Sequence, residues 1–111
     1  MLIRPDEGER LPRGDRDHRV LVELPELEAF ELRFGPDFVV EPHTHDDHVD
    51  SFWVVEGEVE FTLGDERLLA GPGTWFAAPA GAVHGFRTLT EVRLLNVHVP
   101  NSVFGQRLRG G

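Results

Sequence analysis

Short apolar segments, separated by glycine and proline at close intervals, run through most of this 111-residue sequence. Residues 27–34 alternate, with Phe30, Leu32 and Phe34 on one side and small or charged residues between them, as in a half-buried β-strand. No window keeps a helical period beyond a turn near residues 24–28 or after Pro100. About eight to ten short strands joined by tight turns indicate an all-β barrel or sandwich.

The glycines and prolines set the boundaries of the expected elements. Gly57 separates two apolar segments, which predicts a β-hairpin between them. Residues 1–19 are rich in charge, proline and glycine, so we expect an extended arm or a poorly ordered terminus, followed by a single barrel domain at residues 20–111. We expect strands at residues 19–24, 27–34, 38–45, 50–56, 58–63, 67–70, 74–78, 83–88 and 92–99.

Charge and composition restrict the possible partners and reactions. The chain has 20 acidic and 11 basic residues and a net charge of −9, so it would be repelled by nucleic acids and anionic membrane surfaces. Cysteine, lysine and tyrosine are absent from the sequence, which excludes thiolate ligands, a Schiff-base lysine and a tyrosine acid. No stretch approaches the roughly 20 apolar residues of a membrane span, and the first residues lack a signal peptide's apolar segment. We therefore expect a cytoplasmic protein.

Half of the six histidines lie within residues 41–50. His43 and His45 are two residues apart, so their side chains leave one face of a strand. Asp50 follows a short acidic loop and begins the next expected strand, while His84 follows a proline- and glycine-containing turn. Imidazole and carboxylate groups together suit one divalent first-row metal ion: iron, manganese, nickel, cobalt, copper or zinc.

The residues from His43 to Gly57 have a spacing that is found in one family. His43-Thr-His45 is followed after four residues by Asp50 and after six more by Gly57. In this respect the sequence resembles the cupins, whose histidines and acidic residue at these positions bind a metal. The family usually has glutamate where this chain has the shorter Asp50. That carboxylate is therefore expected either to bind the metal directly or to hold a bound water.

A second set of spaced residues surrounds His84. Gly73 is followed after five residues by Pro79-Ala-Gly81, after two more by His84 and after three more by Thr88, where the cupins usually have asparagine. Two independent spacings thus agree, and the resemblance covers about residues 20–100. It implies a jelly-roll barrel, also called a double-stranded β-helix. The ligands that it implies for the metal are His43, His45, Asp50 and His84.

Side chains alternate between the two faces of a strand, so residues an even number of positions apart have the same parity and share a face. Parity selects further side chains that could line a cavity beside the metal. Phe52 and Phe86 have the parity of the expected ligands on their own strands, so the cavity would be mostly apolar. Asn96 and His98 share one face of the last strand and either line the cavity or form a hydrogen-bonded structural pair. The complete set of candidates is Glu41, His48, Phe52, Phe86, Asn96 and His98.

Three titratable residues lie outside the expected ligand set. Glu41 has the parity of His43 and either enters the barrel as an acid or base or remains a solvated strand-end residue. His48 is expected to be an exposed loop residue near the barrel mouth, the alternative being a role as a metal ligand or as an acid or base. His18, in the arm, is expected to be unrelated to the site.

Two tryptophans bear on the oligomeric state. Trp53 and Trp75 are expected to face outward, where they would belong to a partner surface, or else to fill the space between two sheets. The resemblance to single-domain cupins implies a homodimer, often formed by strand exchange at the N-terminal arm.

Three kinds of function fit these features. The first is a metal-dependent enzyme, of oxygenase type, acting on a small aromatic, phenolic or enol-type substrate that is bound through its oxygens. The second is a non-catalytic module that binds or senses a small molecule. The third is a storage or scaffold cupin that uses no metal, which the intact set of ligands disfavours.

Overall fold

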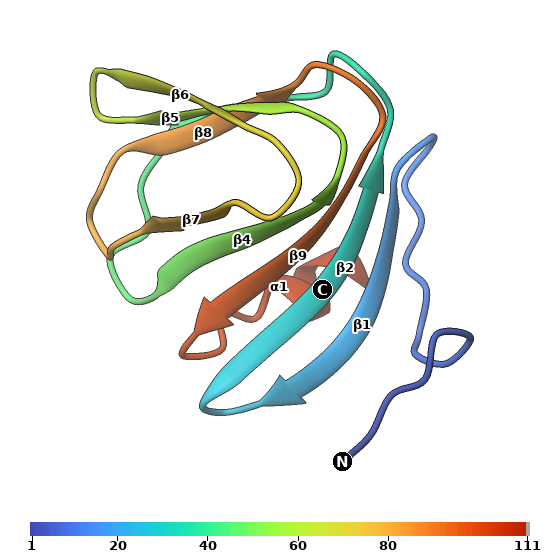
Figure 1. Cartoon of the computed structure of the whole chain (residues 1–111). Helices are drawn as coiled ribbons and strands as arrows, with labels where there is room; N and C mark the ends of the chain where they lie inside the picture. Colours follow the sequence, from blue (N-terminus) through green and yellow to red (C-terminus); the bar gives the residue numbers. More distant parts are fainter. Residues whose placement is uncertain (111) are drawn as a thin grey trace.

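The computed structural model describes residues 1–110, and almost all of their regular structure is β (Figure 1). One short helix, α1 (Phe104–Leu108), follows the last strand. No helix within the described residues is long and apolar enough to cross a bilayer. The strands are β1 (Asp17–Leu24), β2 (Leu27–Phe34), β3 (Val39–His43), β4 (Val49–Glu56), β5 (Val59–Leu63), β6 (Glu66–Ala70), β7 (Trp75–Ala78), β8 (His84–Thr88) and β9 (Val92–Val99).

The strands form two antiparallel sheets that face each other. One sheet has the order β1-β2-β9-β4-β7 and the other the order β3-β8-β5-β6. Figure 1 shows them as two layers, with β5, β6 and β8 opposite β2, β4 and β9. From β3 onward the chain passes repeatedly between the sheets, which is the topology of a jelly roll. The predicted all-β jelly-roll fold is confirmed.

The predicted hairpin at Gly57 is wrong. β4 pairs with β7 and β9, whereas β5 pairs with β6 and β8 in the opposite sheet. Gly57 lies where the chain crosses between the sheets, with a φ of 89°. A Cβ at this position would lie 2.2 Å from the carbonyl oxygen of Glu91, so the crossing requires glycine.

Aromatic side chains fill much of the space between the sheets. The rings of Phe61 and Phe76 stack with their centroids 4.2 Å apart, and Val54 and Leu94 are completely buried beside them in the core. The tryptophans lie outside this core. Trp53 is 37% exposed and Trp75 is 53% exposed, so the alternative that they fill the space between the sheets is wrong.

The N-terminal arm lies along the free edge of β1 (Figure 1). The backbone amide of Leu11 donates to the carbonyl of His18 at 2.7 Å, and the amide of Val20 donates to the carbonyl of Glu9 at 2.8 Å. These hydrogen bonds hold the arm against β1. β1 begins at Asp17, within the range expected for the arm.

Glu31 differs from the alternation expected for β2. Its position faces away from the core, yet its side chain is only 3% exposed. Arg19 and Arg93 both donate to its carboxylate, and the Arg19 guanidinium also donates to the carbonyl of Glu7 in the arm at 2.9 Å. The arm thus covers charged side chains that a solvent-facing strand would expose.

Candidate metal centre

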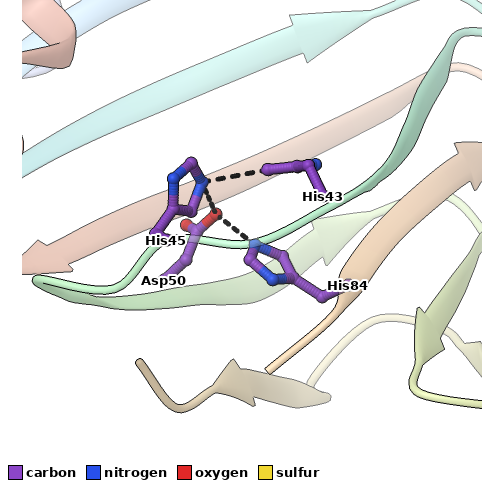
Figure 2. A group of neighbouring side chains, drawn as sticks. All are labelled: His43, His45, Asp50 and His84. Carbon is purple, nitrogen blue, oxygen red and sulfur yellow. Dashed lines mark hydrogen bonds and ion pairs between the residues drawn. The ribbon is translucent and has the colours of Figure 1, made fainter. Parts of the chain in front are cut away.

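The four predicted ligands come together where the two sheets meet at one end of the barrel (Figure 2). His43 ends β3, His45 follows it, Asp50 lies near the start of β4, and His84 begins β8. His43 and His84 are paired in register across β3 and β8, whereas Asp50 reaches the group from the opposite sheet. One possible ligand atom from each residue lies within 4.8 Å of the others.

Short contacts connect these four side chains. The Nε2 atoms of His43 and His45 are 2.9 Å apart, and Nε2 of His84 is 3.0 Å from Oδ2 of Asp50. Nε2 of His45 lies 3.8 Å from the same Oδ2 atom. Figure 2 shows these three contacts converging on one small volume.

Backbone carbonyls orient two of the imidazoles. Nδ1 of His43 donates to the carbonyl of Glu41 at 2.7 Å, and Nδ1 of His84 donates to the carbonyl of Ala82 at 2.9 Å. A proton on Nδ1 leaves the lone pair of Nε2 for the centre of the group, which is how metal-binding histidines are commonly held. Lone pairs and a carboxylate that face one another so closely repel unless a proton or a cation lies between them. The four residues therefore fit a bound cation.

The carboxylate of Asp50 is fixed from the side away from the histidines. Its Oδ1 accepts from Nδ2 of Asn96 at 2.8 Å and from Nε2 of His98 at 3.1 Å, which leaves Oδ2 facing the other three residues of the group. Burial alone would raise the pKa of Asp50, but hydrogen bonds from His84, His98 and Asn96 lower it well below its usual value. Asp50 is therefore ionised, with one oxygen available for a metal.

The third imidazole is kept neutral. Burial lowers the pKa of His45 to about 4, and the neighbouring imidazoles of His48 and His43 contribute to the shift. A neutral imidazole is the form that binds a metal. The donor set therefore suits a first-row divalent ion.

Glu28 is a residue of this network that the sequence did not reveal. Its side chain is completely buried, and its carboxylate accepts from Nδ1 of His98 at 2.9 Å, from the hydroxyl and amide of Ser102, and from the amide of Gly105. Burial would lower the pKa of His98, but hydrogen bonds from its ring to Asp50 and Glu28 raise it, so a charged ring joins two carboxylates. The sequence could have indicated that Glu28 is buried, because it has the parity of Phe30 and therefore lies on the core-facing side of its strand.

A cavity of about 470 Å³ opens beside the four-residue group. Phe52 and Phe86 line it, as parity predicted, together with Phe34 and Phe38. Asn96 and His98 also line the cavity, and both are hydrogen-bonded to Asp50. Both alternatives for these two residues are therefore observed.

His48 is buried rather than exposed, and it lines the cavity. Its ring lies 4.3 Å from that of His45 and 5.1 Å from that of His98, measured between centroids. Asp47 accepts from its Nδ1 at 2.8 Å. The loop folds inward here because the chain must enter β4 in the opposite sheet, which carries the side chain into the barrel.

Glu41 does not enter the barrel: it is exposed and does not line the cavity. The pairing of β3 with β8 is irregular between Val40 and His43, so that both of these residues line the cavity although they are three positions apart. Parity fails across such a bulge. The solvated alternative for Glu41 is therefore the one observed.

Residues that were not expected at the site also reach the cavity. His18 was expected to be unrelated to the site, yet it lines the cavity and packs edge-on against Phe34 and Phe104. Burial is the largest effect on this imidazole and lowers its pKa. Arginines of the arm and of α1 line the cavity as well, and no local pattern indicated them because their position depends on how the flanking segments pack.

A jelly-roll barrel that holds three histidines and a carboxylate at one end of an internal cavity has the architecture of a cupin. The family model described as "Cupin domain" matches residues 30–98, and the chain belongs to this family. The KdgF structure from Halomonas sp. has a TM-score of 0.83 and 24% sequence identity, covering 90% of this chain and 93% of that one. An RmlC-like cupin from Shewanella frigidimarina has a TM-score of 0.79 and 24% identity, with 86% of each chain covered. These likenesses support the fold.

Two curated relatives match in sequence. Quercetin 2,3-dioxygenase from Bacillus subtilis (strain 168) is 27% identical over an alignment of 105 residues that covers 89% of this chain. An uncharacterized protein from Aquifex aeolicus (strain VF5) is 37% identical over 54 residues, which are 49% of this chain. The matched regions are 31% of the first relative and 45% of the second, so the chain spans less than half of either protein.

Replacing Asp50 by asparagine should separate its two possible roles. If Oδ2 binds the metal directly, Asp50→Asn should weaken metal affinity by more than about tenfold, because the anionic donor is lost while the size is kept. If Asp50 only holds a bound water, the loss should be smaller than this. Competition with a metal indicator would measure the affinity. Asp46→Asn, which removes an equal charge from the exposed loop nearby, is the control and should change little.

Proposed function

We propose that this cupin is a metal-dependent enzyme, of oxygenase type, that acts on a small organic substrate inside the barrel. The observation that carries the proposal is the position of the four-residue group, which lies in the wall of a cavity that phenylalanines also line. A first-row metal bound there would polarise the oxygens of a phenolic or enol-type substrate and, if redox-active, support its oxidation. The relative named quercetin 2,3-dioxygenase supports this reaction class.

The chain's own residues would bind and orient the substrate. Phe34, Phe52 and Phe86 offer apolar surface to a carbon skeleton and keep water from it. Of the titratable groups that the sequence suggested, Glu41 lies outside the cavity and His98 is hydrogen-bonded to two carboxylates. His48 is left as the candidate to accept or return a proton, with its Nδ1 held by Asp47.

Turnover assays on the metal-loaded protein test this proposal. The protein would be loaded in turn with iron, manganese, nickel, cobalt, copper and zinc, and incubated with quercetin and with simpler phenols and enols. We expect oxygen uptake and an oxygenated product by mass spectrometry with at least one metal. His48→Ala should keep the metal and lower the rate by about 100-fold or more. Binding of these compounds without any change in them would favour the alternative, a non-catalytic binding or sensing cupin.

We also propose that the chain forms a homodimer. Trp53 and Trp75 lie on neighbouring strands with their rings 6.2 Å apart, and Trp75 is on β7, at the edge of its sheet. Two exposed aromatic rings at a sheet edge are typical of a contact surface. Sedimentation at tens of micromolar should give twice the chain mass of 12.5 kDa, and Trp75→Glu should return the protein to that mass. A wild-type protein that sediments as a monomer would exclude the dimer.

A further inference from the structure

The arginines of this chain fall into two groups. All 11 basic residues are arginine. Three of them, Arg13, Arg16 and Arg107, form no ion pair within residues 1–110, and all three line the main cavity. We refer to these three as the mouth arginines. The other eight each lie within 4.0 Å of a carboxylate: Arg4, Arg10, Arg19, Arg33, Arg67, Arg87, Arg93 and Arg109.

The acidic residues nearest in sequence do not neutralise the mouth arginines. Asp15 and Asp17 line a separate surface pocket, and Asp17 is paired with Arg10. Among the described residues that line the main cavity, Asp50 is the single acidic one, and it is bound by the histidines and Asn96. A divalent ion beside Asp50 would add further positive charge. The cavity would then be cationic in a chain whose net charge is −9.

The mouth arginines are held in place by contacts that use few of their donors. Nη2 of Arg13 donates to the carbonyls of Arg107 and Leu108, each at 3.1 Å, and Nη2 of Arg107 donates to the carbonyl of Ser102 at 3.1 Å. The Arg16 guanidinium lies 5.0 Å above the ring centre of Phe38, and its Nε donates to the carbonyl of Arg13. A guanidinium has five N–H donors, so most of them remain free for a ligand.

We propose that the cavity selects small organic acids, whose carboxylate is bound by the mouth arginines while the carbon skeleton lies against the phenylalanines. Arg16 is the principal contact, because it is half-buried and presents its edge once its face is covered by Phe38. A planar carboxylate matches that edge with two parallel hydrogen bonds. The proposal rests on the proposed function for its second contact, in which another oxygen of the substrate would reach the metal.

Pairs of acids and neutral amides test this selectivity. Benzoate, phenylacetate, cinnamate and 2-furoate would each be compared with the matching amide by calorimetric titration of the full chain, both metal-loaded and after treatment with a chelator. We expect at least one acid to bind more than about tenfold tighter than its amide in both forms. Arg16→Gln should abolish this preference. Arg107→Gln, at an exposed position, should reduce the preference for the acid. It is the test variant to use if Arg16→Gln does not fold.

The control is Arg87→Gln, which removes an equal charge from an arginine that does not line the cavity, and it should keep the preference. If no acid binds more tightly than its amide, including the case in which nothing binds, the inference is wrong. It is also wrong if Arg16→Gln and Arg107→Gln leave the ratio unchanged, or if phenyl phosphate binds better than every acid. Because the chelated protein is measured too, a metal that proves absent or inactive would overturn the proposed enzyme without removing this preference.

Discussion

His84→Ala is expected to lose almost all bound metal, whereas the wild-type protein should retain about one first-row ion per chain. His84 is 3% exposed, and its Nε2 faces Asp50 while its Nδ1 is held by the carbonyl of Ala82. Alanine offers no ligand atom in its place, since its β-carbon ends far from the centre of the group. Elemental analysis after loading and desalting would measure the metal content.

His48→Ala is the matched control for this experiment. His48 is a buried histidine of the same cavity, but it is not one of the four residues whose ligand atoms converge. Its removal should leave the metal content near that of the wild type. Binding by the wild type should also weaken as the pH falls below about 6.5, because protons compete for imidazole nitrogen. A wild-type protein that retains none of the six metals would disprove the metal centre and favour a structural cupin.

Glu28→Ala is expected to lower the free energy of unfolding by about 3–5 kcal/mol, although within the described residues Glu28 forms no hydrogen bond or ion pair with the four metal-site residues. The substitution leaves the charged ring of His98 without one of its carboxylates, and it leaves the hydroxyl of Ser102 and two buried amides without their acceptor. For a domain of this size, the melting temperature should fall by roughly 10–20 °C. Thermal and urea denaturation of the metal-free protein would measure both quantities.

Glu41→Ala provides the comparison for Glu28→Ala. Glu41 is exposed and its carboxylate makes no hydrogen bond or ion pair within the described residues, so its loss should change stability by less than about 0.5 kcal/mol. Glu28→Gln keeps the shape of the side chain and one acceptor oxygen and should be intermediate. If Glu28→Ala is as stable as Glu41→Ala, the buried network contributes nothing to stability.

The strands could be predicted because their signals are local. Alternation in residues 27–34 and the glycine and proline positions placed every strand within a few residues of its observed bounds. The partner of each strand is not a local property. Gly57 marks a turn in either arrangement, and only the packing of the two sheets decides that β4 and β5 separate there.

The candidate site also contains some residues that local patterns indicate and others that they do not. His43, His45, Asp50 and His84 could be selected from two short spacings, because neighbouring strands of a jelly roll bring those spacings together. Parity left two alternatives for Glu41, and the irregularity in β3, which no local pattern indicates, decides for the solvated one. The mouth arginines could not be selected, since they enter the cavity from segments that pack against the barrel and carry no repeating pattern. His18 was missed because β1 begins before the apolar residues that indicated that strand.

The contact between the arm and α1 places the residues that would select a ligand apart from the residues that would hold a metal. Arg13 of the arm donates to the carbonyls of Arg107 and Leu108, so two segments outside the barrel jointly border the cavity, while the four-residue group is held by the barrel and its loops. Substitutions in the flanking segments can therefore alter which molecules are admitted without disturbing the centre where a reaction would occur. Exchanging residues 1–16 and 103–110 between related barrels should accordingly transfer ligand preference and leave metal binding as it was.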